Sequence, residues 1–255
     1  MLHLRTPVLH LRSVAPDVFV LSLHCPELST TVAAGQFVNI LVRDGIEPLL
    51  RRPFSVYRTE GESLEILFRR IGKGTALLAE VEAGDELDLL GPLGHGFHLD
   101  DPGFDTAVLV GGGLGVAPLP IATSALRKAG KDVVTLLGAR SSDLLIDTHL
   151  TNVHVSTDDG TRGLHGTVVD LAAEILEKNK ILKPRFFACG PTLMLRALSA
   201  FTDARDLDCE VSLEGQMACG IGICQGCPVE MAGQERKYSL MCKDGPVFNT
   251  RDIII

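Results

Sequence analysis

Residues 208–255 contain four cysteines whose spacing restricts how this part of the chain can fold. Cys219, Cys224, Cys227 and Cys242 follow the pattern C-x4-C-x2-C-x14-C. A segment of this length is too small to be stabilised by apolar burial alone. Three thiolates from one loop, joined by a fourth from a returning segment, can instead surround a compact inorganic core. We therefore expect residues 208–255 to form a small module that is held together by one metal centre.

The kind of metal centre follows from the order of the spacings. A gap of four residues and then of two is typical of plant-type [2Fe–2S] sites, and the interleaved glycines let the loop wrap closely. Structural zinc prefers two separated cysteine pairs, and only one such pair is present. Seven cysteines, an odd number, without a recognisable export signal argue against a disulfide framework. We therefore predict a [2Fe–2S] cluster with Cys219, Cys224, Cys227 and Cys242 as its ligands.

The overall composition excludes several classes of protein. A hydrophobic content of 45% supports a sizeable core, so a mainly disordered chain is excluded. The net charge of −8 argues against nucleic acid as a partner. Residues 106–126 carry no charge and are long enough to span a bilayer, but the glycines bunched there would break a membrane helix. We expect a cytoplasmic protein without a membrane segment.

Residues 1–100 have the pattern of a small antiparallel β-barrel. Apolar and polar residues alternate in short runs that are separated by glycine, proline and charged clusters, and roughly six such runs favour a barrel. One short helix, at residues 75–81, interrupts the series. The expected strands are residues 18–23, 37–42, 54–58, 64–70 and 86–90.

Residues 101–207 show a different pattern, in which continuously apolar runs alternate with helical segments. Such runs are typical of a parallel sheet that is covered on both faces. We therefore predict a second domain of the α/β class. The expected strand and helix pairs are 107–110 with 116–129, 133–137 with 144–149, 153–156 with 168–177, and 186–188 with 193–201.

Several segments of the α/β domain are candidates for binding a nicotinamide cofactor. The first strand runs into a glycine turn that opens a helix, an arrangement that suits a pyrophosphate. A turn that is rich in glycine only for packing remains an alternative, because the full dinucleotide fingerprint is absent. Other candidate residues follow strands at the carboxyl edge of the sheet, where ligands bind in open α/β folds. Arg140 and Asp158, each taken alone, are also explained as ordinary surface charges. The candidates are Gly112, Gly113, Gly115, Arg140, Asp158, Cys189, Gly190 and Pro191.

The barrel region contains candidates for a flavin site. Arg52, together with the start of the short helix at Gly74 and Thr75, could hold a pyrophosphate from two sides. The hydroxyl group of Ser55 could meet the edge of a flavin ring. Arginine and serine at strand starts are also commonly solvated or capping residues. The candidates are Arg52, Pro53, Phe54, Ser55, Leu67, Phe68, Arg69, Gly74 and Thr75.

Five segments in order resemble the ferredoxin–NADP reductase family: RPFS, GKGT, GPLGHGF, GGGLGVAP and ACGP. The resemblance covers about residues 1–205 and implies an FAD-binding barrel followed by a nicotinamide-binding α/β domain. It implies that Arg52, Phe54 and Ser55 contact FAD and that Gly74 and Thr75 meet its phosphates. It also implies catalytic roles for Ser55 at the flavin and for Cys189 close to the nicotinamide.

The C-terminal motif EGQMACGIGICQGC, with Cys242, is similar to that of the electron transfer subunits of bacterial class 1B dihydroorotate dehydrogenases. This resemblance implies FAD, a [2Fe–2S] cluster and NAD as cofactors, and an FMN-containing catalytic subunit as partner in a heterotetramer. Electrons would run from dihydroorotate through the partner's FMN, the cluster and FAD to NAD⁺, in pyrimidine synthesis. Two alternatives remain open: a small subunit of an electron-bifurcating or sulfide-linked NAD(P)H:ferredoxin oxidoreductase, and a non-catalytic electron carrier. Arg140, followed by two serines, also leaves NADP possible.

Overall fold

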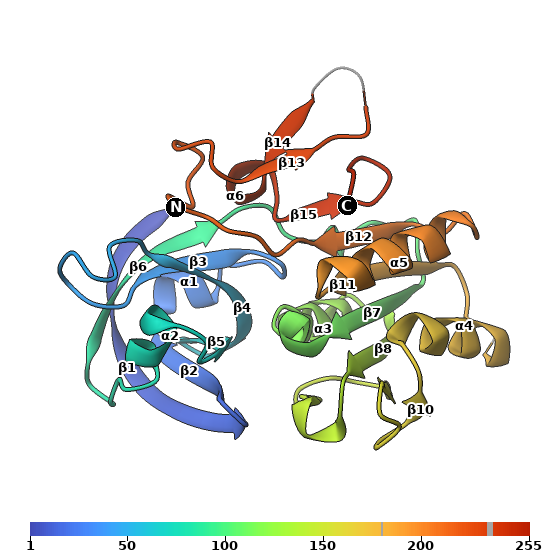
Figure 1. The fold of residues 1–255 in the computed structure, drawn as a ribbon, viewed down its shortest axis with the longest axis horizontal. Helices are drawn as coiled ribbons and strands as arrows, with labels where there is room; N and C mark the ends of the chain where they lie inside the picture. The colour runs from blue at the N-terminus through green and yellow to red at the C-terminus, as the bar shows by residue number, and fades with distance from the viewer. Residues whose placement is uncertain (180, 234–236) are drawn as a thin grey trace.

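A computed structural model describes residues 1–179, 181–233 and 237–255 of the chain. Figure 1 shows a barrel in blue and teal beside a sheet with helices on both faces, drawn in green to orange. The cysteine-rich segment, in red, lies across the top of both in this view. The predicted order of an antiparallel barrel, a parallel sheet and a small cysteine module is therefore confirmed.

Six antiparallel strands close the barrel in the order β1-β2-β5-β4-β3-β6. Apolar side chains such as Val20, Val38 and Ile66 fill its interior and are fully buried. Two short helices, α1 (Pro26–Ser29) and α2 (Lys73–Leu78), connect strands of the barrel. The strands are β1 (Leu2–Ala15), β2 (Val18–His24), β3 (Phe37–Leu41), β4 (Arg52–Glu60), β5 (Ser63–Arg69) and β6 (Glu86–Leu93).

The long first strand of the barrel is absent from the strands expected from the sequence. The first half of β1 pairs with β6, from Leu2 to Pro7, and its second half pairs with β2, from Val8 to Ala15. The register between β1 and β2 shifts at two points. Because each half faces a different neighbour and the register changes, the strand lacks the clean alternation of polar and apolar residues that identifies a strand in a sequence.

The second domain is built on a seven-stranded sheet with the order β10-β9-β8-β7-β11-β12-β15. All neighbouring strands are parallel except β12 and β15, which are antiparallel. In β7, Leu109 packs in the same core cluster as α3, whereas Val108 and Val110 pack in the cluster that contains α4 and α5. This burial on both sides explains the continuously apolar strands. The strands are β7 (Thr106–Gly112), β8 (Asp132–Ala139), β9 (Val153–Thr157), β10 (Leu164–His165), β11 (Pro184–Cys189), β12 (Cys209–Ser212) and β15 (Val247–Asn249), and the helices are α3 (Leu119–Lys128), α4 (Val168–Lys178) and α5 (Thr192–Asp203).

The uncharged segment 106–126 folds as a strand, a turn and a helix, as the sequence predicts. Strand β7 ends in a 3₁₀ turn, Gly113–Val116, and α3 follows directly. In the parts of the chain that the structure describes, none of the helices is long and apolar enough to cross a membrane.

The helix expected at residues 144–149 does not form, so this prediction is wrong. Only a 3₁₀ turn, Ser142–Leu144, is present, and His149 has the left-handed backbone angle φ = 63°. Ile146 is buried in the core, and the hydroxyl group of Tyr57 in the barrel lies 2.8 Å from that of Thr148. Six residues are too few for a helix that is stable by itself, so contacts with the core and the barrel decide the conformation.

The C-terminal segment is shared between the sheet and the cysteine module. Strands β12 and β15 extend the sheet, whereas β13 (Pro228–Glu230), β14 (Tyr238–Leu240) and helix α6 (Met241–Asp244) form the module. The sheet thus continues beyond residue 207, where the sequence suggested a domain boundary. The division into residues 1–100, 101–207 and 208–255 stays a prediction.

Candidate functional site

Two of the expected nicotinamide segments lie in direct contact at the carboxyl edge of the sheet. Strands β7 and β11 are paired neighbours, so the glycine turn and the segment from Cys189 to Pro191 leave the sheet side by side. A Cβ atom at Gly115 would lie only 2.1 Å from the carbonyl oxygen of Cys189. A Cβ atom at Gly112 would lie 2.4 Å from the sulfur of Met194. At Gly115 the neighbouring atoms belong to the backbone, so only glycine permits this close approach.

Gly113 differs from the other glycines of the turn. Its backbone is left-handed, with φ = 55°, and a Cβ atom there would meet no other atom within 4 Å. Arg140 and Asp158 directly follow β8 and β9, and the N–H group of Asp158 donates a hydrogen bond to Ala139 O at 3.0 Å. The structure therefore brings Gly113, Arg140 and Asp158 to the same sheet edge as Cys189, with free space above the turn.

The flavin candidates of the barrel gather around Arg52. A Cβ atom at Gly74 would lie 2.9 Å from the Nε atom of Arg52, so this guanidinium group lies against the start of α2. Thr75 caps the helix: its hydroxyl oxygen accepts hydrogen bonds from the N–H groups of Ile71 and Gly72 at 3.0 and 3.1 Å. Arg52 donates hydrogen bonds to the carbonyl oxygens of Leu50 and Arg51, but the described residues offer it no acidic partner.

The other flavin candidates are divided between the barrel core and its rim. Leu67 and Phe68 are buried in the core, where the ring of Phe68 lies 5.9 Å from that of Phe54. Ser55 pairs with Phe37 across the β3–β4 ladder, and Pro53 pairs with Asn39. Arg69 ends β5 opposite Val18. Because Leu67 and Phe68 are buried in the barrel core, mainly their backbone atoms are left for a cofactor.

The four cysteines of the C-terminal motif lie in one loop region, in two pairs. The Sγ atoms of Cys227 and Cys242 are 3.2 Å apart, and both residues are buried. The Sγ atom of Cys219 accepts a hydrogen bond from the N–H group of Cys224 at 3.4 Å. Cys219 is half-buried and Cys224 is exposed. One pair is therefore internal, and the other reaches the surface.

The donor set of the module consists of four cysteine thiols, Cys219, Cys224, Cys227 and Cys242. Structural zinc needs four donors around one ion. A [2Fe–2S] core distributes its four thiolates over two irons. The donor set of the loop therefore fits a [2Fe–2S] cluster.

The electrostatics of the cysteine loop favour bound cations. Burial alone would raise the pKa of Cys219, but the backbone N–H groups of Cys224 and Ile221 lower it to about 6. Burial raises the pKa of Cys242 to about 12, with a further contribution from the neighbouring Cys227. Two sulfurs 3.2 Å apart cannot both be thiolates without a cation to offset their repulsion. Both the Cys219 thiolate and the close pair Cys227 and Cys242 would therefore be stabilised by a bound metal ion.

The cysteine loop is attached to the barrel by Asn39 in β3. Its amide nitrogen donates a hydrogen bond to the carbonyl oxygen of Cys219 at 3.2 Å, although the two residues are 180 positions apart. A Cβ atom at Gly220 would lie 2.4 Å from the same nitrogen. Because Asn39 is paired with Pro53, the loop lies beside the strand that carries the flavin candidates.

Glu214, which is not among the site residues predicted from the sequence, approaches Cys189. The Cys189 thiol donates to an oxygen of Glu214 at 3.9 Å, and burial, with the charge of Glu214, raises the pKa of this thiol. Burial likewise raises the pKa of Glu214, although the residue as a whole is exposed. Cys189 is therefore a neutral thiol at neutral pH. The only sequence signal for Glu214 is its place before the cysteine motif.

Comparison with known proteins identifies the cysteine module. Residues 214–254 match the family model described as the iron-sulfur cluster binding domain of dihydroorotate dehydrogenase B. A solved structure of an NADH-dependent reduced ferredoxin-NADP oxidoreductase superimposes with a TM-score of 0.86 and 28% identity, over 98% of this chain and 89% of that chain. A ferredoxin NADP⁺ reductase from Neisseria gonorrhoeae, 20% identical with a TM-score of 0.68, matches 79% of this chain and 91% of that chain in fold.

Curated relatives match over nearly the full length. The dihydroorotate dehydrogenase B (NAD(+)) electron transfer subunit of Geobacillus thermodenitrificans is 37% identical over 98% of both chains. The protein of the same name from Fusobacterium nucleatum is 36% identical over 95% of both chains. The resemblance predicted from the sequence is thus confirmed: the chain belongs to the family of dihydroorotate dehydrogenase B (NAD(+)) electron transfer subunits.

Proposed function

We propose that this chain is the electron transfer subunit of an NAD-dependent dihydroorotate dehydrogenase. It would accept electrons from an FMN-containing catalytic subunit, which oxidises dihydroorotate to orotate in pyrimidine synthesis, and deliver them to NAD⁺. Two copies of each subunit would form a heterotetramer. We also propose a cytoplasmic location, because the seven cysteines include a metal-binding set that requires reduced thiols.

One observation carries this proposal: the cysteine loop contacts both of the other candidate sites. Asn39 joins the loop to the strand beside the flavin candidates. Glu214, just before the loop, joins it to Cys189 in the nicotinamide candidate site. A chain of three neighbouring redox sites is what electron transfer between NAD⁺ and a second protein requires.

The cluster would be held by Cys219, Cys224, Cys227 and Cys242. Their backbone surroundings supply N–H groups to the sulfurs: Gly222 N donates to Cys242 Sγ at 3.1 Å. Hydrogen bonds to cluster sulfurs stabilise the reduced form and so set the reduction potential. The exposed Cys224 and its neighbour Ile223, which is 76% exposed, would face the catalytic subunit.

FAD would be held by the barrel. The guanidinium group of Arg52, which has no acidic partner among the described residues, would bind the pyrophosphate beside Gly74 and Thr75. Ser55, with Pro53 and Phe54, would contact the flavin, and the backbone of Leu67, Phe68 and Arg69 would line the site. A flavin exchanges electrons in pairs with nicotinamide and singly with an iron–sulfur cluster, which is the conversion that this subunit needs.

NAD would bind at the carboxyl edge of the sheet. Gly112, Gly113 and Gly115 would let the pyrophosphate approach the backbone, since the space above Gly113 is open. Cys189, Gly190 and Pro191 would border the nicotinamide, where the neutral Cys189 thiol can pack against the ring without adding a negative charge. Arg140 and Asp158 would contact the adenosine half. Ser55 and Cys189 are the proposed catalytic residues.

The function is tested by purifying the chain with its native partner. We expect it to co-purify with an FMN-containing polypeptide, and the complex to form NADH from NAD⁺ when dihydroorotate is added, measured by absorbance. Omitting dihydroorotate is the control. Isolation with a partner that lacks FMN, or NADH formation that does not depend on dihydroorotate, would contradict the proposal.

A second candidate function is supported by the likeness in fold and sequence to the NADH-dependent reduced ferredoxin-NADP oxidoreductase. In that case this chain would be a small FAD and [2Fe–2S] subunit of an electron-bifurcating enzyme. The full-length identity of 37% to dihydroorotate dehydrogenase subunits favours the first function. The same purification separates the two, because a bifurcating partner would show reduction of ferredoxin in place of oxidation of dihydroorotate.

Replacing Arg52 with alanine is expected to weaken FAD binding by about tenfold or more, because a charge-assisted hydrogen bond to phosphate is lost. The dissociation constant is measured by titrating FAD into the deflavinated protein and following flavin fluorescence. Arg43→Ala is the matched control, since Arg43 is an exposed arginine in the loop before β4. Unchanged FAD affinity in the Arg52 variant would contradict the proposed flavin site.

A further inference from the structure

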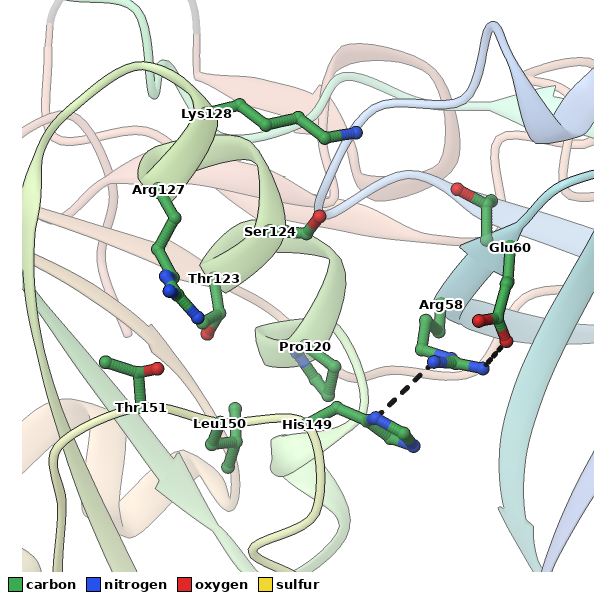
Figure 2. A pocket seen from close by; sticks show the side chains of 11 residues that line it. Arg58, Glu60, Pro120, Thr123, Ser124, Arg127, Lys128, His149, Leu150 and Thr151 are labelled. Carbon is green, nitrogen blue, oxygen red and sulfur yellow. Dashed lines mark hydrogen bonds and ion pairs between the residues drawn. The ribbon is translucent and has the colours of Figure 1, made fainter.

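We propose that the cleft between strand β4 and helix α3 is a second ligand site, which binds a small phosphate-bearing anion. Its volume of about 590 Å³ lies within the range of small-molecule sites. Figure 2 shows the last turn of α3, with Arg127 and Lys128, on one side and Arg58 and Glu60 of β4 on the other. His149 and Thr151 lie below them in the same view.

The cleft is separate from the nicotinamide candidates. Helix α3 begins just after the glycine turn at the carboxyl edge of the sheet and runs back to the amino edge, where Arg127 and Lys128 end it. Residues 149–151 precede β9, so they also lie at the amino edge. None of the residues proposed here for FAD, NAD or the cluster lines this cleft.

The charges of the cleft are basic, although the whole chain carries a net charge of −8. Arg58 is bound to two carboxylates, those of Glu60 and Glu65. In contrast, the side chains of Arg127 and Lys128 have neither a hydrogen bond nor an ion pair within the described part of the chain, and both are exposed at the rim. Two cations without partners, in an acidic protein, leave an excess of positive charge in the cleft.

The neutral donors of the cleft are also suited to an oxyanion. Arg58 Nη1 lies 3.4 Å from His149 Nδ1, which assigns the acceptor role to that nitrogen and leaves the Nε2 atom as a donor. Burial, and then the charge of Arg58, lower the pKa of His149, so the ring is neutral at pH 7. Ser124 and Thr151 add hydroxyl groups to the lining of the cleft. Figure 2 shows Ser124 on α3 and Thr151 below Arg127. A cleft that is lined by both charged and neutral donors can bind the oxygens of a phosphate.

The position of the cleft gives the ligand a means to affect the other sites. Strand β4 carries Arg52 to Ser55 at its other end, and α3 follows the glycine turn. An anion held by both elements would link the barrel to the sheet domain and stabilise their contact more strongly as the anion concentration rises above its dissociation constant. This effect on the other sites rests on the proposed function, because that function assigns FAD to the barrel and NAD to the glycine turn. The binding itself does not depend on it.

The test is a calorimetric titration of inorganic pyrophosphate into the complete FAD-loaded protein in the presence of saturating NAD⁺, which blocks the nicotinamide site. We expect one saturable site, whose affinity falls at least about tenfold when Arg127 and Lys128 are both replaced by glutamine. Both residues are exposed, so the double variant should fold normally, and unchanged NAD⁺ binding verifies this. The matched control is Lys178→Gln with Lys183→Gln, two exposed lysines that pair with Glu174 and Asp105 and do not line the cleft.

Two results would overturn the proposal: no saturable pyrophosphate binding to the native protein, or equal affinity in the native protein and the R127Q/K128Q variant. Neither result touches the proposed electron transfer, because the titration involves no turnover. Conversely, a failure to use dihydroorotate would leave the titration unchanged.

Discussion

Replacing Cys242 with serine will remove the iron–sulfur cluster and reduce partner-dependent NAD⁺ reduction to background. The Sγ atom of Cys242 is buried, lies 3.2 Å from that of Cys227, and accepts a hydrogen bond from Gly222 N. A serine hydroxyl group does not become an anion at neutral pH, so one iron loses a thiolate ligand. Iron analysis and the visible spectrum measure the loss. Oxidation of NADH by a small artificial acceptor, which takes electrons from FAD, will remain.

The matched control for this substitution is Cys209→Ser. Cys209 is buried to the same degree as Cys242, 1% against 2% exposed, but it lies in the sheet strand β12. We expect this variant to retain its iron. A Cys242→Ser protein with full iron content would refute the assignment of the fourth ligand, and loss of iron in both variants would point to general unfolding.

Replacing Gly115 with alanine will slow the reduction of FAD by NADH by about a hundredfold, the scale that a displacement of about 1 Å produces in a reactive geometry. The new Cβ atom would lie 2.1 Å from Cys189 O and 2.5 Å from Gly190 Cα. These are backbone atoms, so no rotation of a side chain relieves the clash, and the glycine turn must separate from the end of β11. Stopped-flow absorbance of the flavin measures the rate.

The contrasting variant is Gly113→Ala. A side chain there meets no atom within 4 Å, and only the left-handed backbone angle opposes it. The cost is about 1–2 kcal/mol of stability, with the contact to Cys189 preserved. Iron content should be normal in both variants, because neither glycine is one of the four proposed cluster ligands. Equal rates for Gly115→Ala and the native protein would exclude the close contact as the basis of nicotinamide binding.

The features that the sequence predicted well are those with a local signal. The alternation in β6 and the apolar run of β7 each reflect the faces that one strand buries, so the barrel and the sheet could be predicted in the right order. The helix expected at residues 144–149 failed because its apolar residues contact the core and the barrel in an irregular conformation. Strand β1 was missed because its two halves pair with different strands.

The sequence by itself determined the chemistry that this protein can hold. The four cysteines are spaced within one short segment, and Gly113 permits the left-handed angle of its own backbone. Only the tertiary structure decided which of these segments meet. The contact of Asn39 with Cys219, that of Glu214 with Cys189, and the basic cleft between β4 and α3 all join residues from separate elements. Such contacts depend on how whole strands and helices pack, and no local pattern of residues records that packing.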